Sequence, residues 1–240
     1  MLTDKYVDGT AWSDILNNYD GDGVVKNSTA SIALKDQIQY AVGRLSMTVK
    51  VADGTLYDGN GETVSVPTEG FPVSAVLIGD QRKVDFQFAP VSKGEKQYTI
   101  YDKELSGINA TTTASRGNNT LVLQTPADED VNVLLELTNN TGKRFKGKDG
   151  YVPAGGKFYL LAPLTPSKGT GYTAGTLDKV FMQDYVTTAN FTIVKNDGTN
   201  HDKGLGAAYN VIPDLRTPAL SIGLSVDLKW QSGLTFNIDM

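Results

Sequence analysis

The chain has 240 residues, of which 40% are hydrophobic and 20% are charged, and its formal net charge is -5. This length and apolar content allow a sizeable core and argue against a disordered chain. No basic block suited to a phosphate backbone is present, so nucleic acid is not expected as a partner. There is no apolar run long enough for a membrane helix, and the lack of cysteine excludes thiol catalysis, thiolate metal sites and disulfides.

The first 36 residues are predicted to form an N-terminal appendage that contains one short amphipathic helix. An apolar stripe at helical spacing runs through "TAWSDILNNY" and stops before Asp20-Gly21, a pair that is typical of a helix end. The stripe consists of Trp12, Ile15, Leu16 and Tyr19.

An oxygen-rich loop, "NYDGDG", has the spacing of the first half of an EF-hand calcium loop. The matching residues are Asn18, Asp20, Asp22 and Gly23. Thr29 stands where such a loop needs a bidentate Glu, and Lys26 places a positive charge inside it. The pattern therefore favours a solvated turn over a calcium site.

Residues 37–240 are predicted to form one all-β domain, an antiparallel β-sandwich. Apolar and polar residues alternate with a period of two, as in half-buried strands, and turn-forming clusters of Gly, Asn and Asp separate the alternating segments. The clearest of these segments are 45–51, 84–88, 131–137, 157–164 and 189–194. No helical period lies between them, which argues against βαβ units. A second short helix is expected over 205–212, before Pro213.

The segment "GKRFKGKD", Gly142 to Asp149, nearly matches the pattern of a phosphate-binding loop. Asp149 stands where a hydroxyl should bind magnesium. A turn and a strand are expected after it, in place of the helix whose N-terminus would hold the anion. The sequence therefore predicts a lysine-rich hairpin tip here rather than a nucleotide site.

No catalytic set is recognisable. His201, the single histidine, lies in a polar loop without the apolar surroundings that tune a catalytic base, and two-histidine zinc sites are excluded. The carboxylates of Asp128, Glu129 and Asp130 belong to "TPADEDV", which is typical of a solvated turn. We therefore predict that the protein is not an enzyme and has no catalytic residue, metal ligand or cofactor.

Four tyrosines near the expected strand ends raise the alternative of carbohydrate binding, because aromatic rings can stack on sugars. They are Tyr151, Tyr159, Tyr172 and Tyr185. Aromatic side chains also lie at strand margins simply because the ring packs while the hydroxyl stays in water. Packing is therefore the favoured interpretation, and sugar binding stays as the alternative.

The C-terminal segment "LSIGLSVDLKWQSGLTFNIDM" has the cleanest alternation in the chain. Its apolar face consists of Leu220, Ile222, Leu224, Val226, Leu228 and Trp230. The alternation resumes after "QSG" through Leu234, Phe236 and Ile238, so the segment forms either a hairpin or two successive strands.

A resemblance covers residues 36–240 and rests on several segments in a fixed order. They are "QYAVGRLSMTVKV", "FPVSAVLIGDQRKVDFQFAP", "YTIYD", "GGKFYLLAPL", "KVFMQDYVTTANFTI" and, most distinctive, "AAYNVIPDLRTPALSIGLSVDLKW". Together they resemble the fimbrillin-type proteins of Bacteroidales, the type V pilin superfamily. The resemblance implies transthyretin-like sandwich domains, export as lipoproteins, and polymerisation at the cell surface into adhesive fimbriae by strand exchange between subunits.

The chain departs from this family at its front, because it lacks the lipid-anchoring cysteine and the signal peptide. We therefore expect an export segment to be missing from these residues, and whether an N-terminal domain is missing as well stays open. Arg44 lies near the point where a related pilin would be processed, but the alternation predicts that it is on the wet face of a strand.

The expected function is that of a structural or adhesive fimbrial subunit at the cell surface or outer membrane. Its expected partners are other fimbrial subunits, with a host protein or glycan as a further partner. The apolar face from Leu220 to Trp230 is the candidate donor strand, which fills a groove in its own subunit or in the next one. The alternative is a surface lipoprotein that binds carbohydrate or a host protein and never polymerises.

Overall fold

The computed structural model describes residues 41–85, 87–91, 98–103, 105, 107–113, 115–195, 205–213, 215, 228–229 and 234–240. Apart from Ala41, all of them belong to one compact unit, Val42–Met240. The predicted first helix, the calcium-like loop and His201 lie outside the described residues, and the domain boundary after residue 36 stays a prediction.

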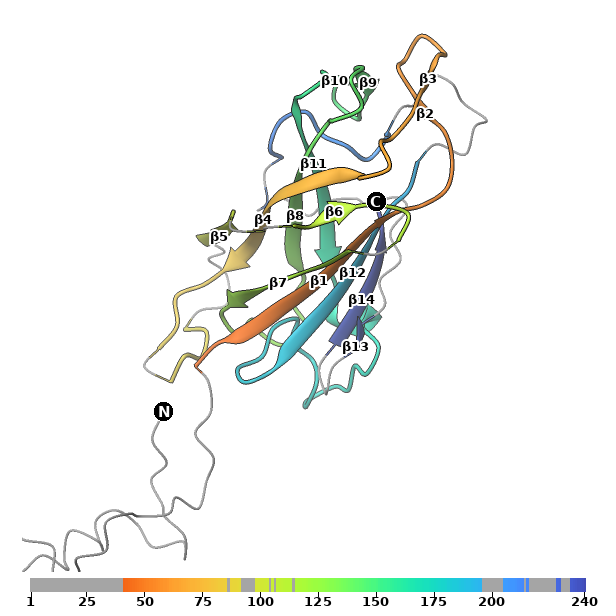
Figure 1. Ribbon diagram of the computed structural model, residues 1–240. Helices are drawn as coiled ribbons and strands as arrows, with labels where there is room; N and C mark the ends of the chain where they lie inside the picture. The colour runs from red at the N-terminus through yellow and green to blue at the C-terminus, as the bar shows by residue number, and fades with distance from the viewer. Residues whose placement is uncertain are drawn as a thin grey trace, which may run out of the picture. The chain divides into compact units, whose positions relative to one another are not determined.

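The first of the two main sheets contains both the first described strand and the C-terminal one. Its order is β13 (Leu228–Lys229), β14 (Leu234–Asp239), β12 (Val186–Ile193), β1 (Gly43–Val51) and β7 (Ser115–Val122). β12 pairs in parallel with β1 on one side and with β14 on the other. The outer pairs, β1 with β7 and β13 with β14, are antiparallel. Figure 1 shows β1, β12 and β14 side by side and pointing the same way.

The second main sheet is antiparallel throughout. Its order is β11 (Lys157–Leu164), β8 (Val131–Thr138), β4 (Phe71–Gln81) and β5 (Tyr98–Asp102), and β6 (Asn109–Ala110) also pairs with β4. Two small hairpins stand apart from both sheets: β2 (Leu56–Tyr57) with β3 (Thr63–Val64), and β9 (Phe145–Lys146) with β10 (Tyr151–Val152). The helical content of the described residues is one 3₁₀ turn, Pro166–Lys168.

The core lies between the two main sheets, where alternation places apolar side chains from both. On β8 the predicted apolar face is fully buried and comprises Val131, Val133, Leu135 and Leu137. On β1 the same holds for Leu45, Met47, Val49 and Val51, while Arg44 is exposed as expected. At one end of the core, Phe158 makes edge-to-face contacts with Phe71 and Phe145 at centroid distances of 5.1 and 5.3 Å. The all-β sandwich prediction is thus confirmed, but the first sheet is mixed rather than antiparallel throughout, because β12 pairs in parallel with β1 and β14.

The outer face of the second sheet contains a small apolar cluster, and the outward-facing residues Asn132, Leu134 and Glu136 of β8 are all buried. One row of cross-strand neighbours runs from Leu161 through Leu134 to Leu77. Leu215 packs against this cluster, and the Asn132 side chain donates a hydrogen bond to the Leu215 carbonyl at 2.8 Å. A segment that follows β12 therefore covers part of the sheet.

The helix expected over 205–212 is wrong. Tyr209 pairs with Tyr159 of β11 instead, and the two residues exchange backbone hydrogen bonds of 2.8 and 2.9 Å. Leu205 and Ala208 are buried in the main core. Pairing with the edge of β11 satisfies backbone groups that a helix would otherwise satisfy internally.

The strand expected over 84–88 is also wrong. The carboxylate of Asp85 accepts hydrogen bonds from the backbone N–H groups of Gln87 and Ala89, at 2.8 and 3.0 Å. Phe88 adopts a φ of 61° and is 36% exposed. An Asp side chain that accepts a hydrogen bond from the backbone N–H two residues later favours a turn. Here this local hydrogen bond outweighs the apolar–polar alternation that predicted a strand.

Leu135→Ala should lower the free energy of unfolding by about 2–5 kcal/mol, because it leaves a cavity in a fully buried position. Leu121→Ala is the matched control, since Leu121 is 62% exposed, and it should change stability by less than about 0.5 kcal/mol. Urea denaturation of both variants measures the difference. Equal losses would contradict the described core.

Candidate functional site

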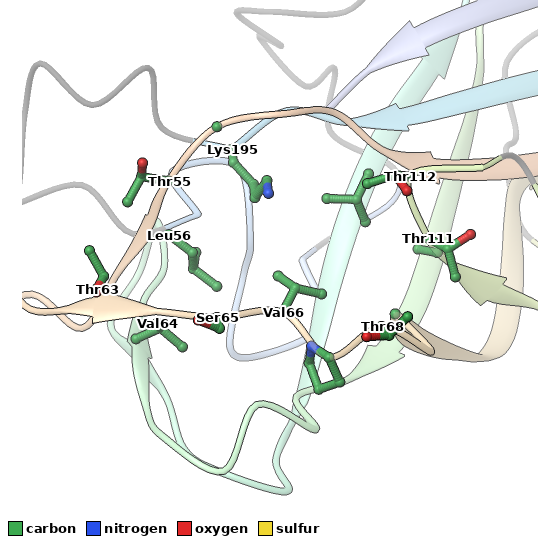
Figure 2. Close-up of a pocket in the computed structure, with 15 residues that line it drawn as sticks. Thr55, Leu56, Thr63, Val64, Ser65, Val66, Thr68, Thr111, Thr112 and Lys195 are labelled. Atoms are coloured by element: carbon green, nitrogen blue, oxygen red, sulfur yellow. The ribbon is translucent and has the colours of Figure 1, made fainter.

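A groove of about 370 Å³ lies where the chain leaves β1 and enters the β2–β3 hairpin. Its walls come from the end of β1, the segment 54–70, the end of β6 and Lys195, which follows β12. Figure 2 shows Leu56, Val66, Thr112 and Lys195 projecting toward the same central space. A volume of this size falls within the range of small-molecule sites.

The groove combines an apolar floor with a hydroxyl-rich rim. The floor includes Val51, Leu56, Val64 and Ala110, which are all buried. The hydroxyl groups belong to Thr55, Thr63, Ser65, Thr68, Thr111 and Thr112. Lys195 is the one charged side chain among the lining residues. Sequence reasoning missed this site, although the hydroxyl runs "TVSVPT" and "TTT" were visible in the chain.

Backbone hydrogen bonds fix the far wall of the groove. The Val51 N–H donates to the Thr111 carbonyl at 2.7 Å, which ties the end of β1 to the end of β6. Gly70 has a φ of +74°, and a Cβ there would lie 2.0 Å from the Ala110 carbonyl oxygen. Only glycine allows this close approach. The Asn140 side chain donates to the Gly70 carbonyl at 2.6 Å and holds the same turn from the other side.

Asp58 organises the tip of the β2–β3 hairpin. Its carboxylate accepts hydrogen bonds from the Asn60 N–H at 2.7 Å and from the Glu62 N–H at 3.1 Å. The Asn60 bond is the main reason that the pKa of Asp58 lies below its usual value. The Glu62 bond and the cations Arg144 and Lys143 lower it further, while burial opposes the shift.

The β9–β10 hairpin lies against this tip and contains the lysine-rich segment. The near match to a phosphate loop is followed by β10 rather than by a helix, as predicted. The Arg144 guanidinium sits 4.4 Å from the centroid of the Tyr151 ring. Gly59, with a φ of +90°, allows the Tyr151 ring to approach its backbone, because a Cβ there would lie 2.7 Å from a ring carbon.

The four tyrosines singled out in the sequence do not come together. They belong to β10, β11, the loop after the 3₁₀ turn and the loop before β12. Tyr151 is 41% exposed and Tyr185 is 37% exposed. Burial is the largest cause of the raised pKa of Tyr159, whereas the pKa of Tyr172 is raised chiefly by its hydrogen bond to Asp128.

The "TPADEDV" segment is a turn between β7 and β8, as predicted. Asp128 accepts a hydrogen bond from the Tyr172 hydroxyl at 2.9 Å. Glu129 forms a salt bridge with Arg82, whose side chain is almost completely buried. Two of the three acidic residues thus have structural partners. In the part of the chain that the structure describes, no group of three His, Asp or Glu side chains could hold a metal ion.

The described part of the C-terminal segment is an antiparallel pair of strands, which agrees with the hairpin, one of the two arrangements that the sequence allowed. β13 pairs antiparallel with β14 through Leu228 with Thr235 and Lys229 with Leu234. The rest of the candidate donor face, Leu220, Ile222, Leu224, Val226 and Trp230, lies outside the described residues. On β14, Leu234, Phe236 and Ile238 are completely buried in the main core. Among the described residues, no helix is long and apolar enough to cross a membrane.

Comparison with known proteins adds little to this description. No protein family model matches the chain, and no curated protein matches it. Among solved structures, one match is a "putative cell adhesion protein" from Bacteroides eggerthii DSM 20697. The two sequences are 9% identical, the TM-score is 0.36, and the match covers 96% of this chain and 73% of that chain.

Replacing Asp58 with Asn should lower the melting temperature at neutral pH, because the amide accepts the two backbone hydrogen bonds less strongly than the carboxylate. A lowered carboxyl pKa contributes stability that is present above the unfolded value, near 3.8, and is lost as the pH falls through the folded value. The difference in melting temperature between wild type and variant should therefore disappear at low pH. Asp53→Asn, at an exposed position in the connection between β1 and β2, is the control and should leave the melting temperature nearly unchanged. A gap that does not vary with pH would contradict the role of the Asp58 charge.

Proposed function

We propose that this chain is a structural and adhesive subunit of a cell-surface fimbria of the type V kind, which assembles by strand exchange between subunits. The observation that carries the proposal is the position of β13. Among the described strands it is the terminal one of the first sheet, it pairs with β14, and it belongs to the segment that the sequence identifies as the candidate donor. The segments that resemble fimbrillin-type proteins, in a fixed order along the sequence, support this class of function.

An edge strand is the part of a sheet that a second copy can replace at least cost. The ladder between β13 and β14 is antiparallel, so an equivalent strand from a neighbour would make the same backbone hydrogen bonds. β14 itself is unsuited to exchange, because its apolar side chains are fully buried between the two sheets. Head-to-tail exchange of this kind does not close on itself and produces a filament.

The same proposal includes a location and partners. A fimbrial subunit acts outside the cell, at the outer membrane or in the fimbrium, and it binds other subunits of its own or a related type. Adhesion adds a host protein or glycan as a further ligand. No catalytic step, metal or cofactor belongs to the proposal.

A disulfide across the hairpin tests exchange, and the absence of native cysteine makes the result simple to interpret. Cross-strand partners have Cα separations that a disulfide can span. The double variant Leu228→Cys with Thr235→Cys should stay monomeric when oxidised, because β13 can no longer leave β14. Reduction should restore assembly to the level of the wild type. Size-exclusion chromatography and negative-stain electron microscopy, before and after limited proteolysis, measure the outcome.

A second disulfide between the partners Thr138 and Lys157, through Thr138→Cys with Lys157→Cys, is the matched control. It joins β8 to β11 in the other sheet, so the oxidised form should assemble like the reduced one. The proposal is wrong if the oxidised Leu228–Thr235 variant assembles normally. It is equally wrong if the wild-type chain forms no assembly under any processing condition.

The second candidate function is a surface protein that binds carbohydrate without polymerising. One observation favours it: Tyr151 of β10 is partly exposed, and the Arg144 guanidinium lies over its ring. The exposed part of the ring supplies an apolar contact for a sugar, and the guanidinium supplies hydrogen-bond donors.

A further inference from the structure

We propose that the groove beside the β2–β3 hairpin binds a sugar that carries a carboxylate, such as a uronic acid. The inference names a site and a ligand class for the second candidate function, carbohydrate binding, and rests on that function rather than on assembly. It follows from three properties of the groove: its charge, the chemistry of its walls and the way those walls are held.

The charge of the groove has the sign opposite to that of the protein. The chain has a formal net charge of -5, yet the lining contains one cation, Lys195, and no carboxylate. Asp53, Glu62 and Glu69 belong to the same stretch of chain but not to the lining. Lys195 is half-buried and, among the described residues, forms no salt bridge. A single ammonium group in a site without carboxylates favours a ligand with one negative charge.

The walls match the two kinds of surface that a sugar ring presents. Thr and Ser hydroxyls both donate and accept hydrogen bonds, as do the hydroxyls of a sugar, and six Thr or Ser residues line this groove, although the Thr111 hydroxyl already donates to the Thr113 carbonyl. The apolar floor, with Leu56 and Val64, suits the C–H faces of the ring. A phosphate would be better matched by an Arg side chain, and no Arg is among the described lining residues.

The walls are also fixed before any ligand arrives. The Val51–Thr111 hydrogen bond, the Gly70 N–H bond to the Pro67 carbonyl at 2.8 Å and the Asn140 bond to Gly70 hold the floor and the far wall. Asp58 holds the hairpin tip through two further bonds. A site that does not have to be ordered on binding loses less conformational entropy.

The test compares methyl β-glucuronide with methyl β-glucoside, which differ only at C6, a carboxylate in the first and a hydroxymethyl group in the second. Isothermal titration calorimetry should show that the full chain binds the glucuronide about tenfold more tightly, in line with a hydrogen bond to a charged group. Lys195→Gln should remove that preference and leave the affinity for the glucoside unchanged. Thr112→Val should weaken both sugars alike. Lys50→Gln, at an exposed position on β1, is the control and should bind both sugars like wild type.

The outcomes separate the inference from the function on which it rests. If both sugars bind equally, or if Lys195→Gln keeps the preference, the acidic-sugar assignment is wrong while carbohydrate binding stands. If neither sugar binds at millimolar concentration, the assignment and the second candidate function both fail. Amide chemical-shift changes that map to Tyr151 and not to Thr111 or Thr112 would place the sugar site on the β9–β10 hairpin. That result would contradict the assignment of the groove as the sugar site.

Discussion

The parallel pairing of β12 with both β1 and β14 is the constraint on which the rest of the described unit depends. β12 lies between the first described strand and the C-terminal strand, so the sheet is complete only when both parts of the chain are in place. Met240 continues this ladder, because its N–H donates to the Thr192 carbonyl at 2.6 Å. Contacts so distant in sequence cost loop-closure entropy, which the apolar side chains buried between the two sheets must offset.

The outer faces of the two main sheets differ in polarity, and this difference determines whether another segment of the chain can pack on each face. On the outer face of the first sheet, Thr48 donates to Asn190 at 2.5 Å, and Asn190 donates to Asn237 at 3.0 Å. This polar row crosses three strands and satisfies its own hydrogen bonds. The outer face of the second sheet has a cluster of leucines instead of a polar row. Leu215, from the part of the chain after β12, packs on this cluster. Its leucines are thereby kept from water.

The sequence predicted the strands well where alternation was long, and poorly where local chemistry or distant pairing decided the structure. The faces of β1 and β8 followed directly from a period of two. Nothing in that period distinguishes a parallel from an antiparallel neighbour, so the parallel pairs of β12 could not be predicted. The carboxylate of Asp85 and the pairing of Tyr209 with β11 overrode the local pattern. The groove was missed because Val51, Thr111 and Lys195 are far apart in sequence and meet only through the fold.

The direction of the strands also places the two proposed sites, the sugar-binding groove and the β13 edge, at opposite ends of the first sheet. Because β1, β12 and β14 are mutually parallel, their carboxyl ends gather at one end of the sheet, where Val51 and Lys195 line the groove. The start of β14, which pairs with β13, lies at the opposite end of that strand. Six residues of extended chain span about 20 Å. Exchange of β13 would therefore begin at a distance from the groove, so one fold can present a ligand site and an assembly edge without one occupying the other.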